Sequence, residues 1–282
     1  MGAYLLQFDS THGRFELECI AEGESILVGD NKNKITRRIK YTNHNKPEAI
    51  PWEELGVEIV LECTGAFLTS ESMQGHFVHG IKKIVVSAPV DAGGVLNVVM
   101  GCNEHLVTPA MNIVTAASCT TNCAAPVIGA LDAAFGIEVG SVNTVHNVTP
   151  TQSIMDVPNP GKKNDLRRAR SGAVNLAPTT TGSSKAIAMI YPHLKGKLDG
   201  LAIRVPCQNA SITDLVLLVK KDVTKEEVNA VLKNAAAARP TIFGFEERPL
   251  VSTDYTGDSR STIIDALSTL VVANRLIKVF AW

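Results

Sequence analysis

The first 118 residues contain short apolar runs separated by polar turns. The runs at 57–63 and 112–116 are rich in β-branched residues, and small or polar residues follow each of them. Strands that are buried on both faces of a parallel sheet have this composition. The pattern therefore predicts a parallel-sheet domain of Rossmann type in this part of the chain, with further strands at 81–87 and 95–100.

The pattern changes after Cys119, where the strands become longer and alternate between two faces. Residues 138–146 and 211–219 alternate in this way, as strands do in an antiparallel sheet with one covered face. The stretches 184–190 and 225–237 have the pattern of helices. We predict an α/β chain in two parts, a parallel-sheet domain over 1–118 and an α+β domain with a mostly antiparallel sheet over 119–282.

The predicted parallel strands end on residues that suit a binding site. Ligands of open α/β sheets bind beyond the carboxyl ends of the strands. Thr64-Gly65, Ser87-Ala88 and Ser118-Cys119 all follow predicted strands. We therefore expect these three pairs to lie at the ligand-binding edge of the sheet.

Cys119 stands at a predicted strand-to-helix turn, inside the run Ser118-Cys119-Thr120-Thr121-Asn122. Unpaired backbone N–H groups converge at such a turn, favour a thiolate over a thiol, and can hold a developing oxyanion. The alternative is a small buried hydrophobic residue. The hydroxyl and amide side chains around the cysteine favour a nucleophile.

A thiol nucleophile needs a partner that accepts its proton. Of the seven histidines, His146 is the best candidate, because it ends a predicted alternating strand 27 positions after Cys119. A strand-end histidine with a purely structural hydrogen bond is the alternative.

Several segments have the chemistry of anion sites. The run 179–182 (TTTG) precedes a predicted helix, whose N–H groups would bind an anion, although simple helix capping is the alternative. Arg204 lies on a short predicted strand, where a solvated surface charge is the other possibility. Arg167, Arg168 and Arg170 follow a loop marked by the PNPG run at 158–161, and a solvated basic loop would look the same.

Composition narrows the choice of partners. The chain has 282 residues and a formal net charge of −1, which gives no electrostatic case for nucleic acid or an anionic membrane as main partner. No apolar run approaches the ~18 residues of a membrane span, and no secretory signal is visible. The six cysteines are scattered without CxxC pairs, so we expect no metal site, no disulfide framework and a cytoplasmic setting.

These pieces together resemble the glyceraldehyde-3-phosphate dehydrogenase family. The resemblance begins at 4–13 (YLLQFDSTHG) and reaches the last residue. It includes the runs ECTG at 62–65, SAP at 87–89, ASCTTNC at 117–123, TVH at 144–146, TG at 181–182 and RVP at 204–206.

The resemblance implies a function for each candidate. The first domain would be a truncated dinucleotide-binding domain for NAD, with NADP also possible, and the second would be catalytic. Cys119 would attack the aldehyde, and His146 would take the proton. Inorganic phosphate would then cleave the thioester. Thr149 and Arg204 would bind the substrate phosphate, and the family tends to form homotetramers. The attacking phosphate would be bound by Ser118, Thr120, Thr181, Gly182 and Arg167, and Arg170 is the alternative to Arg167. The nicotinamide end of the cofactor would be bound by Thr64, Gly65, Ser87 and Ala88.

The chain also departs from this family. It has no Gly-x-Gly-x-x-Gly run before the first matched segment, and it ends at Trp282, before the family's Tyr-Asp-Asn-Glu segment. Both departures affect the dinucleotide-binding part, so we expect reduced affinity for NAD. They leave open a catalytically dead or assembly-only paralogue. Erythrose-4-phosphate dehydrogenase is a further alternative, because it shares the Cys/His pair.

Overall fold

The computed structural model describes residues 1–30, 35–90, 94–158 and 165–282. The chain divides into two compact units, one of residues 1–60 and 71–83 and the other of residues 61–70 and 84–282. Residues 84–118 therefore lie in the same unit as residues 119–282, and the domain boundary near residue 118 stays a prediction. Residues 159–164 of the predicted loop lie outside the described residues. None of the described helices is long and apolar enough to cross a membrane.

The first unit begins with helix α1 (Gly2–Gln7) and a short antiparallel pair, β1 (Phe8–Asp9) and β2 (Gly13–Arg14). An antiparallel three-stranded sheet follows, in the order β3-β4-β5. The buried Gln7 side chain donates to the carbonyls of Phe15 and Leu17 and accepts from the Cys19 N–H, so it ties α1 to β3. The remaining elements are β3 (Glu18–Glu22), β4 (Ser25–Gly29), β5 (Ile35–Lys40) and the 3-10 turns η1 (Pro47–Ala49) and η2 (Glu71–His79).

A four-stranded sheet in the order β6-β7-β9-β8 carries the predicted parallel strands. Strand β9 pairs in parallel with β7 and with β8. The Ser87 N–H donates to the carbonyl of Glu62, which joins β7 to β6 at their carboxyl ends. The strands are β6 (Ile59–Glu62), β7 (Lys83–Val86), β8 (Leu96–Asn97) and β9 (Ile113–Thr115), and the turn η3 (Glu104–Leu106) follows β8.

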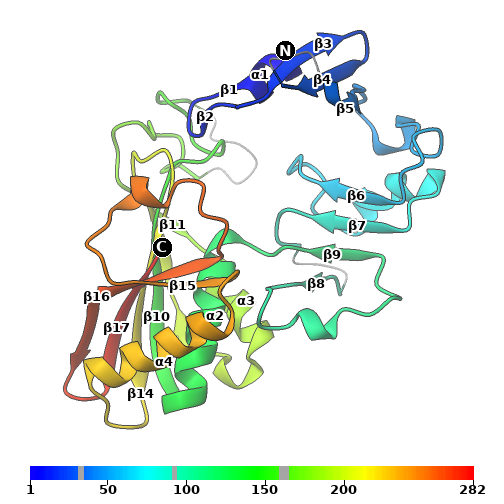
Figure 1. Cartoon of the computed structure of the whole chain (residues 1–282). Coiled ribbons are helices and arrows are strands. Elements are labelled where there is room, and N and C mark those ends of the chain that lie inside the picture. Colours follow the sequence, from blue (N-terminus) through cyan, green and yellow to red (C-terminus); the bar gives the residue numbers. More distant parts are fainter. Residues whose placement is uncertain (31–34, 91–93, 159–164) are drawn as a thin grey trace. The chain divides into compact units, whose positions relative to one another are not determined.

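The rest of the second unit is built on a mixed sheet in the order β11-β13-β10-β14-β17-β16-β15, with β12 also paired to β10 (Figure 1). Its long central strands pair antiparallel, whereas β12 and β13 run parallel to β10, and β15 runs parallel to β16. The strands are β10 (Ile137–His146), β11 (Ala177–Thr180), β12 (Leu198–Asp199), β13 (Leu201–Arg204), β14 (Ile212–Val219), β15 (Phe243–Glu246), β16 (Thr262–Val272) and β17 (Leu276–Ala281).

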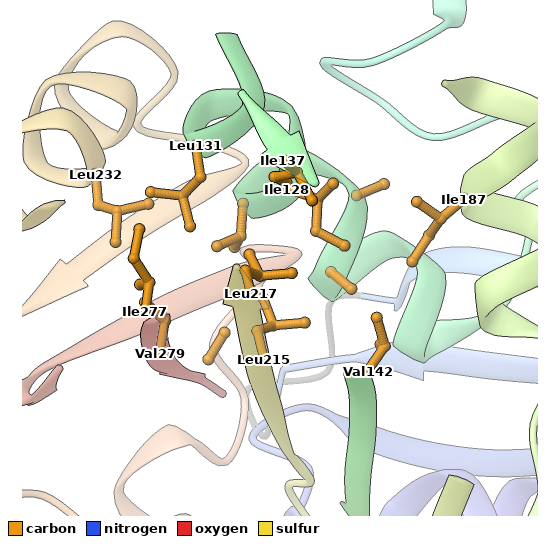
Figure 2. Close-up of a cluster of buried hydrophobic side chains, with 14 of the residues drawn as sticks. Ile128, Leu131, Ile137, Val142, Ile187, Leu215, Leu217, Leu232, Ile277 and Val279 are labelled. Atoms are coloured by element: carbon orange, nitrogen blue, oxygen red, sulfur yellow. The ribbon is translucent and has the colours of Figure 1, made fainter. Parts of the chain in front are cut away.

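Helices pack on one face of this sheet and enclose the core. Leu215 and Leu217 of β14 and Ile277 of β17 are fully buried and lie against Ile128 and Leu131 of the first helix after β9 (Figure 2). The alternation that predicted β14 arises because every second residue faces these helices. The helical elements are α2 (Cys119–Phe135), α3 (Ser183–Ile190), α4 (Lys225–Ala238) and the turns η4 (Pro192–Leu194) and η5 (Ser252–Tyr255).

The predicted fold class is confirmed, because a parallel Rossmann-like sheet and an α+β unit with a mixed sheet are both present. The antiparallel sheet over residues 18–40 was not predicted. Strand β3 is mostly exposed and lacks an apolar run, and β4, although half-buried to buried, has only the three large apolar residues Ile26, Leu27 and Val28. Both strands are therefore shorter or more polar than the continuous runs that mark buried strands.

Candidate active site

A sharp turn between β9 and α2 presents Cys119. Ala117 has a positive φ of 55°, which is uncommon for a residue with a Cβ, and its N–H donates to Thr115 Oγ1 at 2.9 Å. Ser118 caps the helix by accepting the Thr121 N–H at 3.2 Å. Cys119 is therefore the first residue of a 17-residue helix, and its side chain is exposed. The free N–H groups of this helix end favour a negative charge on the thiol.

His146 ends β10 beside this thiol. Its Nε2 lies 3.4 Å from Cys119 Sγ, and the ring is buried. The hydrogen bond with His146 lowers the pKa of the Cys119 thiol below its ordinary value, and the charge of the ring and the Thr120 N–H act in the same direction. The atoms packed around the sulfur at the pocket floor partly desolvate it and oppose this shift without reversing it. A thiol with a lowered pKa beside a histidine is the arrangement of an activated nucleophile.

The other ring nitrogen of His146 has two close neighbours. Nδ1 lies 2.8 Å from the Asn147 carbonyl and 2.6 Å from Arg204 Nη1. A neutral imidazole carries one proton, so Nδ1 either donates to the carbonyl or accepts from the guanidinium. The choice decides whether Nε2 accepts a proton from Cys119 or already carries one.

A pocket of about 900 Å³ opens at the Cys119–His146 pair. Its wall carries three cations, Arg168, Lys185 and Arg204, and one carboxylate, that of Asp165, so its charge suits an anion. Burial and the positive charge of Arg168 lower the pKa of Arg204, and an anion between them would offset that repulsion. Arg204 Nε is buried and has no hydrogen-bond partner in the described part of the chain. Other residues of the wall are Asn97, Ser118, Thr120, Thr151, Thr181 and Gly182.

Most of the predicted anion-binding residues lie at this pocket. Ser118, Thr120, Thr181, Gly182 and Arg204 line it. Thr149 is not among the lining residues, but its hydroxyl lies 2.8 Å from the hydroxyl of Thr151, which lines the pocket.

The arginines after the loop differ from the prediction. Arg167 is not among the residues that line the pocket, and its Nη1 donates to the Pro178 carbonyl at 3.0 Å. Arg170 pairs with Asp156 at 2.7 Å on the surface. Arg168 lines the pocket instead, and its Nη1 donates to Thr151 Oγ1 at 2.8 Å.

Thr151 is thus a residue that the sequence did not single out, and Arg168 was named only as one of three basic residues after the loop, without a role at the phosphate. Asp165 fixes Arg168 by accepting from its Nε at 3.2 Å. An acidic residue three positions before an arginine in a turn is the one signal that favoured Arg168 over Arg167, because such a pair restrains a long side chain.

The four residues expected at the cofactor lie at the carboxyl ends of β6 and β7. The Thr64 N–H and hydroxyl both bind the Glu62 carboxylate, so the chain turns away from the sheet here. Gly65 has a φ of 70°, and nothing lies within 4 Å of where a Cβ would stand. Thr64, Gly65 and Ser87 are exposed, and Ala88 is half-buried. Small residues around an open backbone at this edge fit a dinucleotide, because its flat rings approach the strand ends closely.

The fold and the site define an enzyme with a nucleophilic thiol, an anion pocket and a parallel-sheet edge of the dinucleotide-binding type. Comparison with known proteins agrees with this class. Residues 118–282 match the glyceraldehyde 3-phosphate dehydrogenase C-terminal domain, and residues 1–70 match the NAD binding domain of the same family.

Individual relatives support the same assignment. The chain is 48% identical over 283 residues to glyceraldehyde-3-phosphate dehydrogenase 3 of Nostoc sp. (strain PCC 7120), covering 99% of this chain and 81% of the relative. It is 44% identical to the glyceraldehyde-3-phosphate dehydrogenase of Geobacillus stearothermophilus, over 99% of this chain and 81% of that protein. The chain belongs to the glyceraldehyde-3-phosphate dehydrogenase family, a family of NAD-dependent oxidoreductases, and NAD is its cofactor.

Proposed function

We propose that the chain catalyses the phosphorylating oxidation of glyceraldehyde 3-phosphate to 1,3-bisphosphoglycerate. The observation that carries this proposal is the 3.4 Å contact between Cys119 Sγ and His146 Nε2 in a pocket with Arg168 and Arg204. A thiolate suits attack on an aldehyde, and the two guanidinium groups suit phosphate dianions. The family assignment supports the substrate.

In the proposed reaction, Cys119 and His146 carry out the chemical steps. The Cys119 thiolate attacks the aldehyde carbon to form a thiohemiacetal, and the Cys119 N–H stabilises the oxyanion. His146, which took the thiol proton, gives it to this oxyanion, and its Nε2 takes the same proton back from the hydroxyl as the carbon loses its hydride. Bound NAD supplies the hydride acceptor, near Thr64, Gly65, Ser87 and Ala88. The resulting thioester on Cys119 is cleaved by inorganic phosphate, which gives the acyl phosphate and frees the thiol.

We assign the two phosphate groups to two sets of residues. Thr149 and Arg204 bind the phosphate of the substrate. The attacking phosphate binds to Ser118, Thr120, Thr181 and Gly182, and Arg168 takes the place that the family resemblance assigns to Arg167. The contact of Arg168 with Thr151 supports this exchange.

A direct assay tests the proposal. Purified chain is mixed with NAD, glyceraldehyde 3-phosphate and inorganic phosphate, and formation of NADH is followed by absorbance. We expect NADH formation that needs phosphate and is lost in Cys119→Ala. Oxidation that is equally fast without phosphate would contradict the phosphorylating reaction.

The same assay separates the alternatives. Erythrose 4-phosphate replaces glyceraldehyde 3-phosphate, and a larger kcat/KM for it would reassign the substrate. Calorimetry with NAD tests the catalytically dead or assembly-only alternative, since micromolar binding of NAD would exclude it. NADP in a parallel titration decides between the two dinucleotides.

We also propose that the chain forms a homo-oligomer, a tetramer by its family, and acts in the cytoplasm. Large apolar side chains are exposed on the mixed sheet, among them Val139, Leu201, Leu270 and Val272. Exposed apolar surface of this kind is typical of subunit interfaces. Light scattering of the purified chain measures its mass, and a monomer at micromolar concentration would contradict the proposal.

A further inference from the structure

His146 accepts a proton from Cys119 only in one of its two neutral forms. The Nε2 that faces Cys119 must have a free lone pair, so the ring proton must lie on Nδ1. The Asn147 carbonyl, 2.8 Å from Nδ1, accepts that proton. Arg204 Nη1 has two acceptors within reach: the Nδ1 lone pair at 2.6 Å, which would favour the opposite form, and the Asn147 carbonyl at 3.2 Å, which is compatible with a proton on Nδ1. The position of the Asn147 carbonyl therefore decides the state of the catalytic pair.

Every other polar group of Asn147 is occupied. Its N–H donates to Ser211 Oγ at 3.1 Å, and the Ser211 hydroxyl donates back to Asn147 Oδ1 at 3.0 Å. Asn147 Nδ2 donates to the Gln208 carbonyl at 3.1 Å. These bonds fix the peptide and the side chain of Asn147, so that its carbonyl is directed at His146.

Ser211 is itself held by the mixed sheet. The next residue, Ile212, begins β14 and pairs with Val145, directly before His146. Ala210, the preceding residue, has a φ of 59°, which turns the chain into β14. The hydroxyl of Ser211 is thus fixed relative to β10, although 64 residues separate Ser211 from Asn147 in the sequence.

We propose that Ser211 and the Asn147 side chain are positioning residues that set His146 as the proton acceptor of Cys119. We call the pair the Asn147 clamp. It touches neither substrate nor thiol, and it acts through the Asn147 carbonyl. The clamped carbonyl holds the Nδ1 proton already without substrate, while Arg204 Nη1 donates to the same carbonyl. Substrate phosphate that engages Arg204 then removes the remaining competition for Nδ1. The inference rests on the proposed function, because it needs His146 as the base.

The rate of Cys119 alkylation by iodoacetamide, measured from pH 5 to pH 10 without cofactor or substrate, tests the clamp. Ser211→Ala removes the hydroxyl that fixes the Asn147 peptide. Because one hydrogen bond of about average strength is weakened, we expect the midpoint of the pH–rate profile to rise by about half a pH unit to one unit. The plateau at high pH stays the same, since the thiolate itself is unchanged.

Two further variants separate positioning from folding. Ser211→Thr keeps the hydroxyl and borders a pocket of about 270 Å³ that can take a methyl group, so it restores the original midpoint. Asn147→Ala removes both side-chain hydrogen bonds of Asn147, so we expect it to raise the midpoint as Ser211→Ala does. It tests the clamp independently if the Ser211→Ala variant does not fold. Asn143→Ala is the matched control on β10, because among the residues that the structure describes the Asn143 amide bonds only Ser141 and Leu201.

The outcomes are distinct. Superimposed profiles for the unsubstituted chain, Ser211→Ala and Asn147→Ala would overturn the clamp. An equal shift in Asn143→Ala would also overturn it, because general loosening of β10 would then be the cause. An unsubstituted chain whose Cys119 reacts like an ordinary thiol would instead contradict the proposed function, and the two failures are told apart by this one profile.

Discussion

Cys119 and Cys123 lie one turn apart on helix α2, yet their thiols have opposite chemistry. Cys119 is exposed at the first helical residue, and contact with His146 lowers the pKa of its thiol. Cys123 is buried, with 7% of its surface exposed, and burial raises the pKa of its thiol. The Cys123 sulfur lies 3.6 Å from the Ala281 carbonyl, inside the core.

The difference shows that position along the helix, and not residue type, makes a nucleophile. The helix N-terminus supplies free N–H groups only to its first turn. One turn later the same helix faces the mixed sheet, where a charged thiolate would be costly. Arg167 and Arg168 repeat this contrast, because only the second of these neighbours reaches the pocket.

Replacement of each cysteine by alanine gives the largest expected effect. Cys119→Ala removes the attacking atom, so we expect kcat to fall by at least about a thousandfold. Cys123→Ala touches no reacting atom and keeps kcat within about threefold. Steady-state NADH formation measures both. Comparable losses in the two variants would break the comparison.

The next largest expected effect is the difference in alkylation rate between Cys119 and Cys123. A lowered pKa means that Cys119 becomes a thiolate at lower pH than an ordinary cysteine. At pH 7 we therefore expect iodoacetamide to label Cys119 on the order of a hundredfold faster than Cys123. The advantage of Cys119 over accessible ordinary thiols shrinks as pH rises, because those thiols then ionise too, whereas burial still protects Cys123. Tandem mass spectrometry, with fragment ions that separate Cys119 from Cys123 on their shared tryptic peptide, gives the two rates. Equal, slow labelling would contradict an activated thiolate.

The neighbouring arginines give a smaller effect. Loss of a charged donor to phosphate costs about 1.5–3 kcal/mol, so Arg168→Ala should raise KM for inorganic phosphate roughly tenfold to a hundredfold. Arg167→Ala, which loses a bond to the Pro178 carbonyl outside the pocket, changes KM by less than about threefold. The reverse ranking in initial-rate kinetics would restore Arg167 as the phosphate ligand.

The smallest expected effects of the two cysteine substitutions are on stability, and here Cys123→Ala is expected to cost more than Cys119→Ala. Cys123→Ala leaves a small gap in the core and lowers the free energy of unfolding by about 1 kcal/mol. Cys119→Ala alters an exposed side chain and changes it by less than about 0.5 kcal/mol. Urea denaturation followed by circular dichroism measures both. A larger loss for Cys119→Ala would show that its thiol also stabilises the fold.

Much of the second unit follows directly from periodicity. The predicted helix at 225–237 is α4 (Lys225–Ala238), whose start is marked by a capping box between Thr224 and Glu227. The predicted strand at 211–219 is β14 (Ile212–Val219). Both elements have one face against the core, so their apolar positions repeat with the period of the element. The short antiparallel strands β3 (mostly exposed) and β4 (half-buried to buried) do not alternate between two faces over a long enough run, and they could not be predicted.

The candidate site was predictable where a residue acts from the end of an element. Cys119 and His146 were singled out because each terminates or begins a predicted element, and the structure brings them within 3.4 Å. Arg168 and the Asn147 clamp were not predictable in this way. Their partners, Thr151 and Ser211, lie 17 and 64 residues away in the sequence.

The sequence by itself determined the fold class, the strand-to-helix turn at Cys119 and the family, because apolar periodicity and a dense local motif are properties of contiguous residues. Only the tertiary structure decided which arginine faces the pocket and which carbonyl meets His146 Nδ1. It also decided which of the two α2 cysteines is exposed. These depend on side-chain direction and on contacts between strands far apart in the chain. Hydrogen bonds of this length require positions fixed to a few tenths of an ångström, which packing supplies and sequence spacing does not.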